Sequence, residues 1–298
     1  MKISVLTATY NRKENLKNLY NSLLKNAKFG YEIEWIIMDD GSTDDTEEYI
    51  NQIKNNSEIT IKYFKQDNQG KMVAINNIVQ YAEGELLVEC DSDDYLTDNA
   101  IKIICTSYEK IQNKKNIYAM VFLKDNANRC NIGTCFKDDL YETNMFNLYF
   151  KDGLEGDKAL VYITSIRKKY HYRIEKNEKF STEARMHNEM DKTYSVICFN
   201  KPIMICDYLS QGYSKNIRKV FKQNPNGYYE YFKQLLNFDM SGVLFRKRLY
   251  AIKHYILFCA LTGKKNITKE ISGTLNKFLV LVLKIPGYIK TKIDFKGE

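Results

Sequence analysis

Residues 81–96 read YAEGELLVECDSDDYL, and this stretch decides how the chain folds. Gly84 ends an expected helix, and the apolar run that follows predicts a buried strand over 85–90. Three carboxylates come directly after that strand, at Asp91, Asp93 and Asp94. In an open α/β sheet, ligands bind outside the carboxyl ends of the strands, so this acidic turn is a candidate site.

The sequence on either side of this stretch alternates between strand and helix patterns. Period-two or short apolar runs predict strands over 3–9, 34–38, 59–64, 85–90 and 118–123. Apolar residues at helical spacing predict helices over 15–24, 44–53, 71–82 and 99–111. Strands that alternate with helices of this length are typical of βαβ crossovers, so we expect an α/β fold with a mostly parallel sheet.

Three polar clusters follow the carboxyl ends of predicted strands: Thr7–Asn11, Asp39–Ser42 and Asp91–Asp94. We expect them to converge on one edge of the sheet. Clustered carboxylates repel one another, and hard cations that accompany phosphate groups are commonly held by one or two carboxylates. The alternative is an acidic turn before a helix that Asp98 or Asn99 caps.

Four segments, in this order, resemble the inverting family 2 glycosyltransferases of the GT-A fold. They read VLTATYNR (5–12), WIIMDDGSTDDT (35–46), DNQGKMVAINN (67–77) and YAEGELLVECDSDDYL (81–96). The resemblance implies a Rossmann-like, mostly parallel central sheet flanked by helices. It also implies a GT-A catalytic domain over 1–218, with a nucleotide-sugar-binding half in 1–100 and an acceptor-binding half in 101–218. Two later segments, 156–170 and 180–216, resemble small bacterial surface-polysaccharide transferases of the capsule or teichoic acid type.

The same resemblance assigns the donor site. It implies that a UDP-sugar is bound by residues of all four segments: Thr7, Ala8, Thr9, Tyr10, Asn11, Asp40, Asn68, Lys71, Asp91 and Ser92. Asp40 would face the uracil. Asp91-Ser92-Asp93 resembles the DxD motif, in which Asp93 would bind Mn²⁺ or Mg²⁺, with Asp91 towards the ribose or the metal and Asp94 in support.

An inverting transfer also needs a general base for the acceptor hydroxyl. The family places an acidic residue at the start of a helix some distance beyond the DxD motif. Glu183, at the start of a helix expected near 182–192, is our first candidate. Asp157, where we expect a helix near 157–169, is the second. An acidic residue in a first helical turn is also favoured by the helix dipole alone. Short strands are expected over 196–199 and 203–206.

The basic excess of the chain lies in its last quarter. The net charge is +8, yet residues 219–298 hold 15 Lys and Arg against 5 Asp and Glu, and residues 1–218 hold 30 against 32. We expect a helical extension over 219–298, with helices at 227–238, 241–262 and 268–284. Basic amphipathic helices over 241–292 predict either an anionic membrane surface as partner or packing on the catalytic domain or in a homodimer. We expect no nucleic acid partner, because the usual modules are missing.

The seven cysteines form no CxxC pair, several lie in apolar runs, and we expect reduced core thiols. The N-terminus has a strand pattern and no signal-peptide core, and no run of 18 apolar residues occurs. We therefore expect a cytoplasmic protein, with peripheral attachment to the inner face of the cell membrane as an option.

These observations together predict a metal-dependent inverting glycosyltransferase. It would move one sugar from a UDP-sugar to a hydroxyl of a glycan or lipid-linked acceptor in cell-envelope polysaccharide synthesis. The absence of a QxxRW motif favours a non-processive enzyme. The alternatives are a nucleotidyltransferase that makes NDP-sugars, and a catalytically dead glycan-binding protein.

Overall fold

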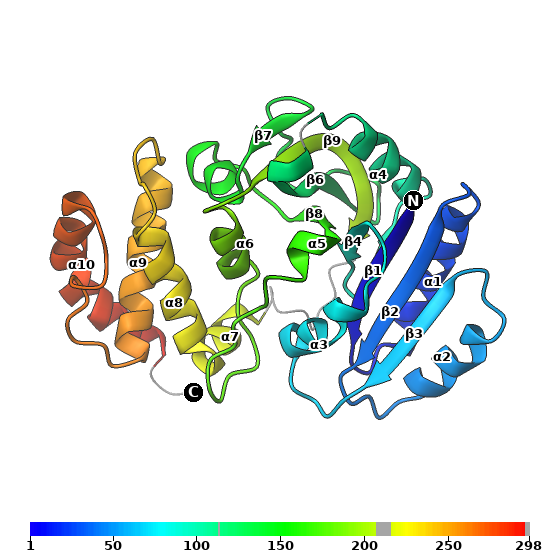
Figure 1. Cartoon of the computed structure of the whole chain (residues 1–298). Coiled ribbons are helices and arrows are strands. Elements are labelled where there is room, and N and C mark those ends of the chain that lie inside the picture. The colour runs from blue at the N-terminus through cyan, green and yellow to red at the C-terminus, as the bar shows by residue number, and fades with distance from the viewer. Residues whose placement is uncertain (113, 207–215, 296–298) are drawn as a thin grey trace. The chain divides into compact units, whose positions relative to one another are not determined.

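The computed structural model describes residues 1–112, 114–206 and 216–295. The chain forms two compact units (Figure 1). The first comprises Met1–Asn144, Leu154–His171 and Thr193–Gly212, and the second comprises Met145–Gly153, Tyr172–Lys192 and Tyr213–Glu298. The division differs from the single boundary expected at 218, because two segments from the middle of the chain group with the C-terminal helices.

One mixed sheet organises the first unit. In the described residues it has nine strands, ordered β3-β2-β1-β4-β8-β6-β9-β5, with β7 paired to β9. Their bounds are β1 Lys2–Thr9, β2 Glu32–Asp39, β3 Thr60–Lys65, β4 Leu86–Glu89, β5 Asp94–Leu96, β6 Ile117–Asn126, β7 Tyr141–Thr143, β8 Lys158–Ile163 and β9 Ser195–Cys206. The half β3-β2-β1-β4 is parallel throughout, as expected, whereas β8, β5 and β7 pair antiparallel to their neighbours.

Helices cover both faces of the parallel half (Figure 1). The helical segments are α1 Lys13–Ala27, α2 Thr46–Lys54, α3 Lys71–Ile78, η1 Val79–Tyr81, α4 Ala100–Glu109, η2 Lys114–Asn116 and α5 Thr164–Arg167. Apolar residues of α1 and α4, spaced three or four apart, join Ile3, Val5 and Trp35 of the sheet in one buried cluster. The α3 helix packs against β1 and β2 with residues outside that cluster.

The helix expected near 157–169 is wrong for most of its length. Residues 158–163 (KALVYI) form β8, which pairs antiparallel with both β4 and β6, and only α5 is helical. Val161 and Tyr162 are both buried although they point to opposite faces. A strand covered on both faces reads as a continuous apolar run, which periodicity alone does not distinguish from a buried helix. The strands expected over 196–199 and 203–206 are one strand, β9, with register shifts against β6.

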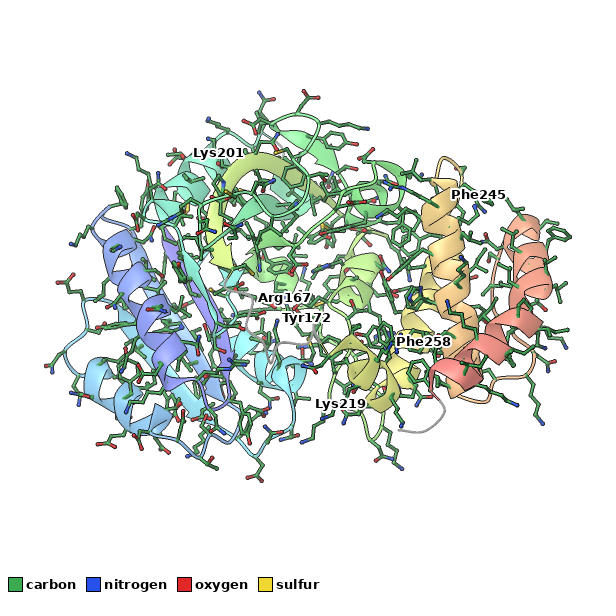
Figure 2. The ribbon with its side chains drawn as sticks, turned by 180° about the vertical axis from the view of Figure 1, so that it is seen from behind. Arg167, Tyr172, Lys201, Lys219, Phe245 and Phe258 are labelled. Carbon is green, nitrogen blue, oxygen red and sulfur yellow. The ribbon has the colours of Figure 1, made fainter. Side chains whose placement is uncertain are left out.

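The second unit is helical. Its elements are the π-helical turn η3 Asn147–Lys151 and the helices α6 Ala184–Met190, α7 Ile217–Gln223, α8 Pro225–Leu236, α9 Phe245–Leu261 and α10 Thr274–Asp294. The three C-terminal helices confirm those expected, with shifted bounds. An aromatic-rich cluster from α8 and α9 forms the core, with Phe258 inside it and Phe245 exposed at the start of α9 (Figure 2). None of the helices in the described residues is both long and apolar enough to span a membrane.

Candidate functional site

The loops that follow β1 and β2 are joined by Asn11. Its backbone N–H donates to Ser42 Oγ at 2.9 Å, and its side-chain Oδ1 accepts from Thr43 N at 2.8 Å. Asn11 adopts a left-handed conformation with φ of 53°, which asparagine tolerates better than most residues. This geometry confirms that the first two polar clusters converge at the carboxyl edge of the parallel strands.

Asp40 organises the third loop of this edge. Its carboxylate accepts hydrogen bonds from the backbone N–H groups of Gln69 and Gly70, each at 2.8 Å, and from Gln66 Nε2. Asn68 donates to the Asp40 carbonyl at 3.0 Å. The buried carboxylate therefore serves as the anchor of loop 66–70, a role that the sequence analysis did not assign to it.

Residues 7–11, which the resemblance places in the donor site, are not equally accessible. Thr7 is fully buried and accepts a hydrogen bond from Trp35 Nε1 at 3.0 Å, so it is a core residue in this structure. Thr9 is also buried, and its hydroxyl has no hydrogen-bond partner among the described residues. Ala8 is half-buried, whereas Tyr10 and Asn11 are exposed. Tyr10 is thus the aromatic ring of this segment that a ligand at the edge can reach.

The acidic turn after β4 meets the start of α3. Lys71 Nζ lies 2.6 Å from Asp91 Oδ1, which brings together two residues that the sequence analysis placed near the nucleotide. The Asp94 N–H donates to the Asp91 carbonyl at 3.0 Å and closes a tight turn, in which Ser92 is buried. Asn99 occupies the N-cap position of α4 without a side-chain capping bond, so capping does not explain this turn.

Asp93 occupies an electrostatically unfavourable position. Burial raises its pKa, and the neighbouring charges of Asp91 and Asp94 raise it further, while Arg12 opposes this effect. Among the described residues, no three His, Cys, Asp or Glu side chains gather into a complete metal site. Two carboxylates that repel each other still fit a hard cation whose remaining ligands are phosphate oxygens and water. The donor set is therefore compatible with the expected Mn²⁺ or Mg²⁺.

Asp94 is held differently from its two neighbours. Its buried carboxylate accepts from Lys124 Nζ at 2.9 Å and from Cys206 Sγ at 3.2 Å. Burial favours the neutral amine of Lys124, but the negative charge of Asp94 prevails, and the pKa of Lys124 is raised well above its ordinary value. Lys124 was not among the candidate residues, since the strand it belongs to was expected to end at Leu123. The available signal was a lysine directly after a continuous apolar run.

A second buried ion pair fixes the end of β4. Arg167, which is labelled in Figure 2, is fully buried. Its Nε lies 2.6 Å from Glu89 Oε1. Its Nη1 donates to the Tyr170 carbonyl at 2.6 Å. Glu89 comes two residues before Asp91, so the pair restrains the strand that carries the acidic turn. This pair was not expected from the sequence, because Arg167 lies in a stretch where an ordinary helix was expected.

The two candidate bases lie in different units. Asp157 is exposed in the loop before β8, in the first unit. Glu183 is half-buried at the N-cap position of α6, in the second unit, and its carbonyl accepts from the N–H groups of Met186 and His187. The expected helix start at Glu183 is therefore confirmed. Its role as a base stays a prediction.

A mixed sheet flanked by helices, whose parallel strands end in linked polar loops, fits the GT-A fold. The chain belongs to the glycosyl transferase family 2, whose model matches residues 4–204. The staphylococcal poly(ribitol-phosphate) β-N-acetylglucosaminyltransferase TarS, residues 1–349 in complex with UDP-GlcNAc, superposes with a TM-score of 0.61 at 17% identity and covers 99% of this chain and 92% of its own. This likeness confirms the GT-A fold with C-terminal helices.

Sequence relatives are similar over shorter segments. An uncharacterized glycosyltransferase of Mycoplasma genitalium, MG060, is 34% identical over 126 residues, which is 41% of each chain. TarS of Staphylococcus aureus is 32% identical over 102 residues, or 34% of this chain and 18% of TarS. A Campylobacter jejuni GalNAc(5)-diNAcBac-PP-undecaprenol β-1,3-glucosyltransferase is 30% identical over 161 residues, 53% of this chain and 45% of the relative. The chain thus matches less than half the length of each of these relatives.

Proposed function

We propose that the protein is a metal-dependent, inverting and non-processive glycosyltransferase. It would transfer one sugar from a UDP-sugar to a hydroxyl of a glycan or lipid-linked acceptor in bacterial cell-envelope polysaccharide synthesis. The family assignment supports sugar transfer. The observation that carries the donor site is the contact between Lys71 and Asp91 beside Asp93, at the edge where the loops after β1 and β2 meet.

The donor assignment is supported by the chemistry of this edge. TarS binds UDP-GlcNAc, and a Pyrobaculum mannosyltransferase with a TM-score of 0.50 binds GDP-mannose with Mn²⁺. In our proposal Tyr10 lies against the uracil, and Asp40 receives a base N–H through the remaining lone pair of its Oδ2. Lys71 and Arg12 supply positive charge for the diphosphate. Asp91 and Asp93 would hold the divalent cation, which neutralises the charge that grows on UDP as it leaves.

The acceptor side of the proposal rests on Glu183. As general base it would accept the proton of the acceptor hydroxyl while the oxygen attacks the anomeric carbon, which inverts the configuration there. Asp157 is the second candidate for this role. TarS is named for poly(ribitol-phosphate) and the Campylobacter relative for an undecaprenol-linked glycan, and the second name supports the acceptor class.

The alternatives receive less support. A nucleotidyltransferase of this fold needs a glycine-rich loop after the first strand, and residues 7–15 contain no glycine. A dead glycan-binding protein has no need to retain the mutually repelling Asp91 and Asp93. The seven free thiols support a reducing compartment and thus a cytoplasmic location, at the membrane face where lipid-linked acceptors lie.

The donor site is tested by UDP release from a panel of UDP-sugars with and without Mn²⁺. We expect Asp93→Asn to lose most of the metal-dependent release. Asp98→Asn is the matched control, because it removes the same charge five residues away, where Asp98 makes an exposed ion pair with Lys25. If wild type and Asp93→Asn released UDP equally fast with Mn²⁺, Asp93 would not be a ligand of the metal. A wild-type protein that releases UDP from no sugar in the panel would contradict the donor class.

A further inference from the structure

The last helix carries a row of large apolar side chains on its surface. Seven of them are between 47% and 71% exposed: Leu275, Phe278, Leu281, Val282, Ile285, Ile289 and Ile293. We call this set the apolar stripe of α10. Their spacing of three and four residues at 3.6 residues per turn confines them to roughly one third of the helix circumference. Exposure of so much contiguous apolar surface marks an interaction site rather than a solvated face.

The opposite face of α10 is fixed on the second unit. Asn276, Val280 and Thr291 are buried on that side. A Cβ atom at Gly287 would approach Ile256 of α9 to 2.6 Å, so this glycine permits close contact between the two helices. The orientation of the helix is thereby set, and the apolar stripe does not belong to the core of the unit.

The neighbouring basic helix α9 behaves differently. Its apolar residues Ile252, Tyr255 and Phe258 lie in the core cluster with α8. Packing therefore accounts for most of the apolar residues of α9, although Phe245 and Tyr250 are exposed in its first half. The expectation of a membrane-facing region over 241–292 narrows to α10 alone.

The charge of α10 matches an anionic surface. The helix contains four lysines and one acidic residue: Lys277, Lys284, Lys290, Lys292 and Asp294. At 100° per residue, Lys277 and Lys284 fall along one edge of the apolar stripe and Lys290 falls along the other, whereas Lys292 falls within the stripe near the end of the helix. Lysines at the borders of an apolar face extend their ammonium groups to lipid headgroups while their methylenes lie on the acyl boundary.

We propose that the apolar stripe of α10 is a membrane-docking surface that binds anionic lipid. The helix would lie in the plane of the interface over its length of about 31 Å, with the stripe buried among acyl chains. A second copy of the chain is a poorer occupant. Pairing two stripes would bring eight lysines together with only two Asp294 carboxylates to offset them. The inference is independent of sugar transfer, since it concerns only this face.

Flotation of the full-length protein with lipid vesicles tests the proposal. We expect binding to vesicles of phosphatidylcholine with 30% phosphatidylglycerol and much weaker binding to pure phosphatidylcholine. The triple variant Phe278→Ser, Leu281→Ser, Ile285→Ser should bind about tenfold or more weakly. Leu140→Gln, at a similarly exposed residue of the first unit, is the matched control and should bind like wild type.

Two further measurements make each result decisive. Replacing Lys277, Lys284, Lys290 and Lys292 by Gln should weaken binding and remove its salt dependence, and none of these four lysines is buried. The thermal midpoint checks the fold of each variant, and if the triple variant unfolds, the single change Ile285→Gln takes its place. Wild type that does not float, or variants that float equally well, would overturn the proposal. A wild-type dimer that the triple variant converts to monomer, without vesicle binding, would assign the face to a second copy.

Discussion

Lys124 Nζ lies 2.9 Å from Asp94 Oδ2 in the interior of the first unit, where the two side chains are 13% and 4% exposed. Cys206 Sγ donates to the same oxygen at 3.2 Å. One carboxylate of the acidic turn is thus neutralised by the protein itself. In our proposal the cation is held by Asp93 and by Asp91, which contacts Lys71 at 2.6 Å, whereas Asp94 holds β5 against β9.

Removal of the buried lysine should destabilise the protein strongly. In Lys124→Met the Asp94 carboxylate would stay buried without its cation, and we expect a loss of about 3–5 kcal/mol in the free energy of unfolding. Asp94→Asn added to Lys124→Met should restore part of that loss, because the buried charge is then gone. Urea unfolding measures both effects.

The exposed ion pair of Lys25 with Asp98 provides the control for this experiment. Its side chains are 61% and 64% exposed, so Lys25→Met should change stability by about 0–1 kcal/mol. If Lys124→Met were as stable as Lys25→Met, the buried pair would have no role in fixing the acidic turn.

The parallel half of the sheet was predictable because its signals are local. Each strand there is a short apolar run that ends in a polar turn, and each helix has its own apolar stripe, so the position of Asp91 after a buried strand follows from 16 residues of sequence. The convergence of the first two clusters through Asn11 and Ser42 followed from the rule for parallel strands.

The features that were missed depend on partners far along the chain. Lys124 is 30 residues from Asp94, and Cys206 is 112 residues from it, so no spacing rule connects them. The β8 strand is defined by its antiparallel neighbours β4 and β6, and its sequence also suits a buried helix. The burial of Thr7 results from its contact with Trp35, which a family motif does not reveal.

Acid should destabilise the protein through Glu34. This fully buried carboxylate accepts from Ser4 Oγ and the Glu83 N–H and lies 2.9 Å from Lys62 Nζ. Burial raises its pKa, but these partners outweigh burial, and the net pKa is lowered. A group whose folded pKa is depressed stabilises the protein above its unfolded pKa of about 4.3 and loses that contribution as the pH falls below it.

We therefore expect the wild-type urea midpoint to drop between about pH 5 and pH 3. Glu34→Gln should be less stable at pH 7 and show a flatter pH dependence in this window. Glu32→Gln is the matched control, since Glu32 is 63% exposed and its ion pair with Lys2 is screened by solvent. A drop of the same size in Glu34→Gln and wild type would assign the acid sensitivity to other carboxylates.

Loop 66–70 should depend on the charge of Asp40. In Asp40→Asn, an NH2 group would replace one of the two carboxylate oxygens. It would then face the backbone N–H of Gln69 or Gly70, so that two hydrogen-bond donors oppose each other. We expect a loss of about 1–3 kcal/mol in stability together with weaker binding of UDP, measured by thermal unfolding and calorimetry.

Asp45→Asn is the control for the loss of one negative charge, because it removes a carboxylate that does not hold loop 66–70. Asp45 is 69% exposed and pairs only peripherally, with Lys13 at 3.1 Å, so its replacement should leave UDP affinity unchanged. If Asp40→Asn kept full UDP affinity, neither the anchoring of loop 66–70 nor a contact of Asp40 with the uracil would contribute to donor binding.

Glu183 and Asp157 can be distinguished by separating donor binding from transfer. Glu183→Gln keeps the size of the side chain, and the backbone carbonyl of residue 183 still accepts the first hydrogen bonds of α6. The fold and UDP affinity should therefore persist. Transfer to acceptor should fall by about 10²–10⁴-fold, because the attacking hydroxyl loses its proton acceptor.

Asp157→Asn should leave transfer near the wild-type rate, since its carboxylate is exposed before β8. The reverse pattern, with normal transfer in Glu183→Gln and its loss in Asp157→Asn, would move the base to Asp157. Product release from a UDP-sugar in the presence of acceptor, measured beside UDP binding for each variant, gives the result.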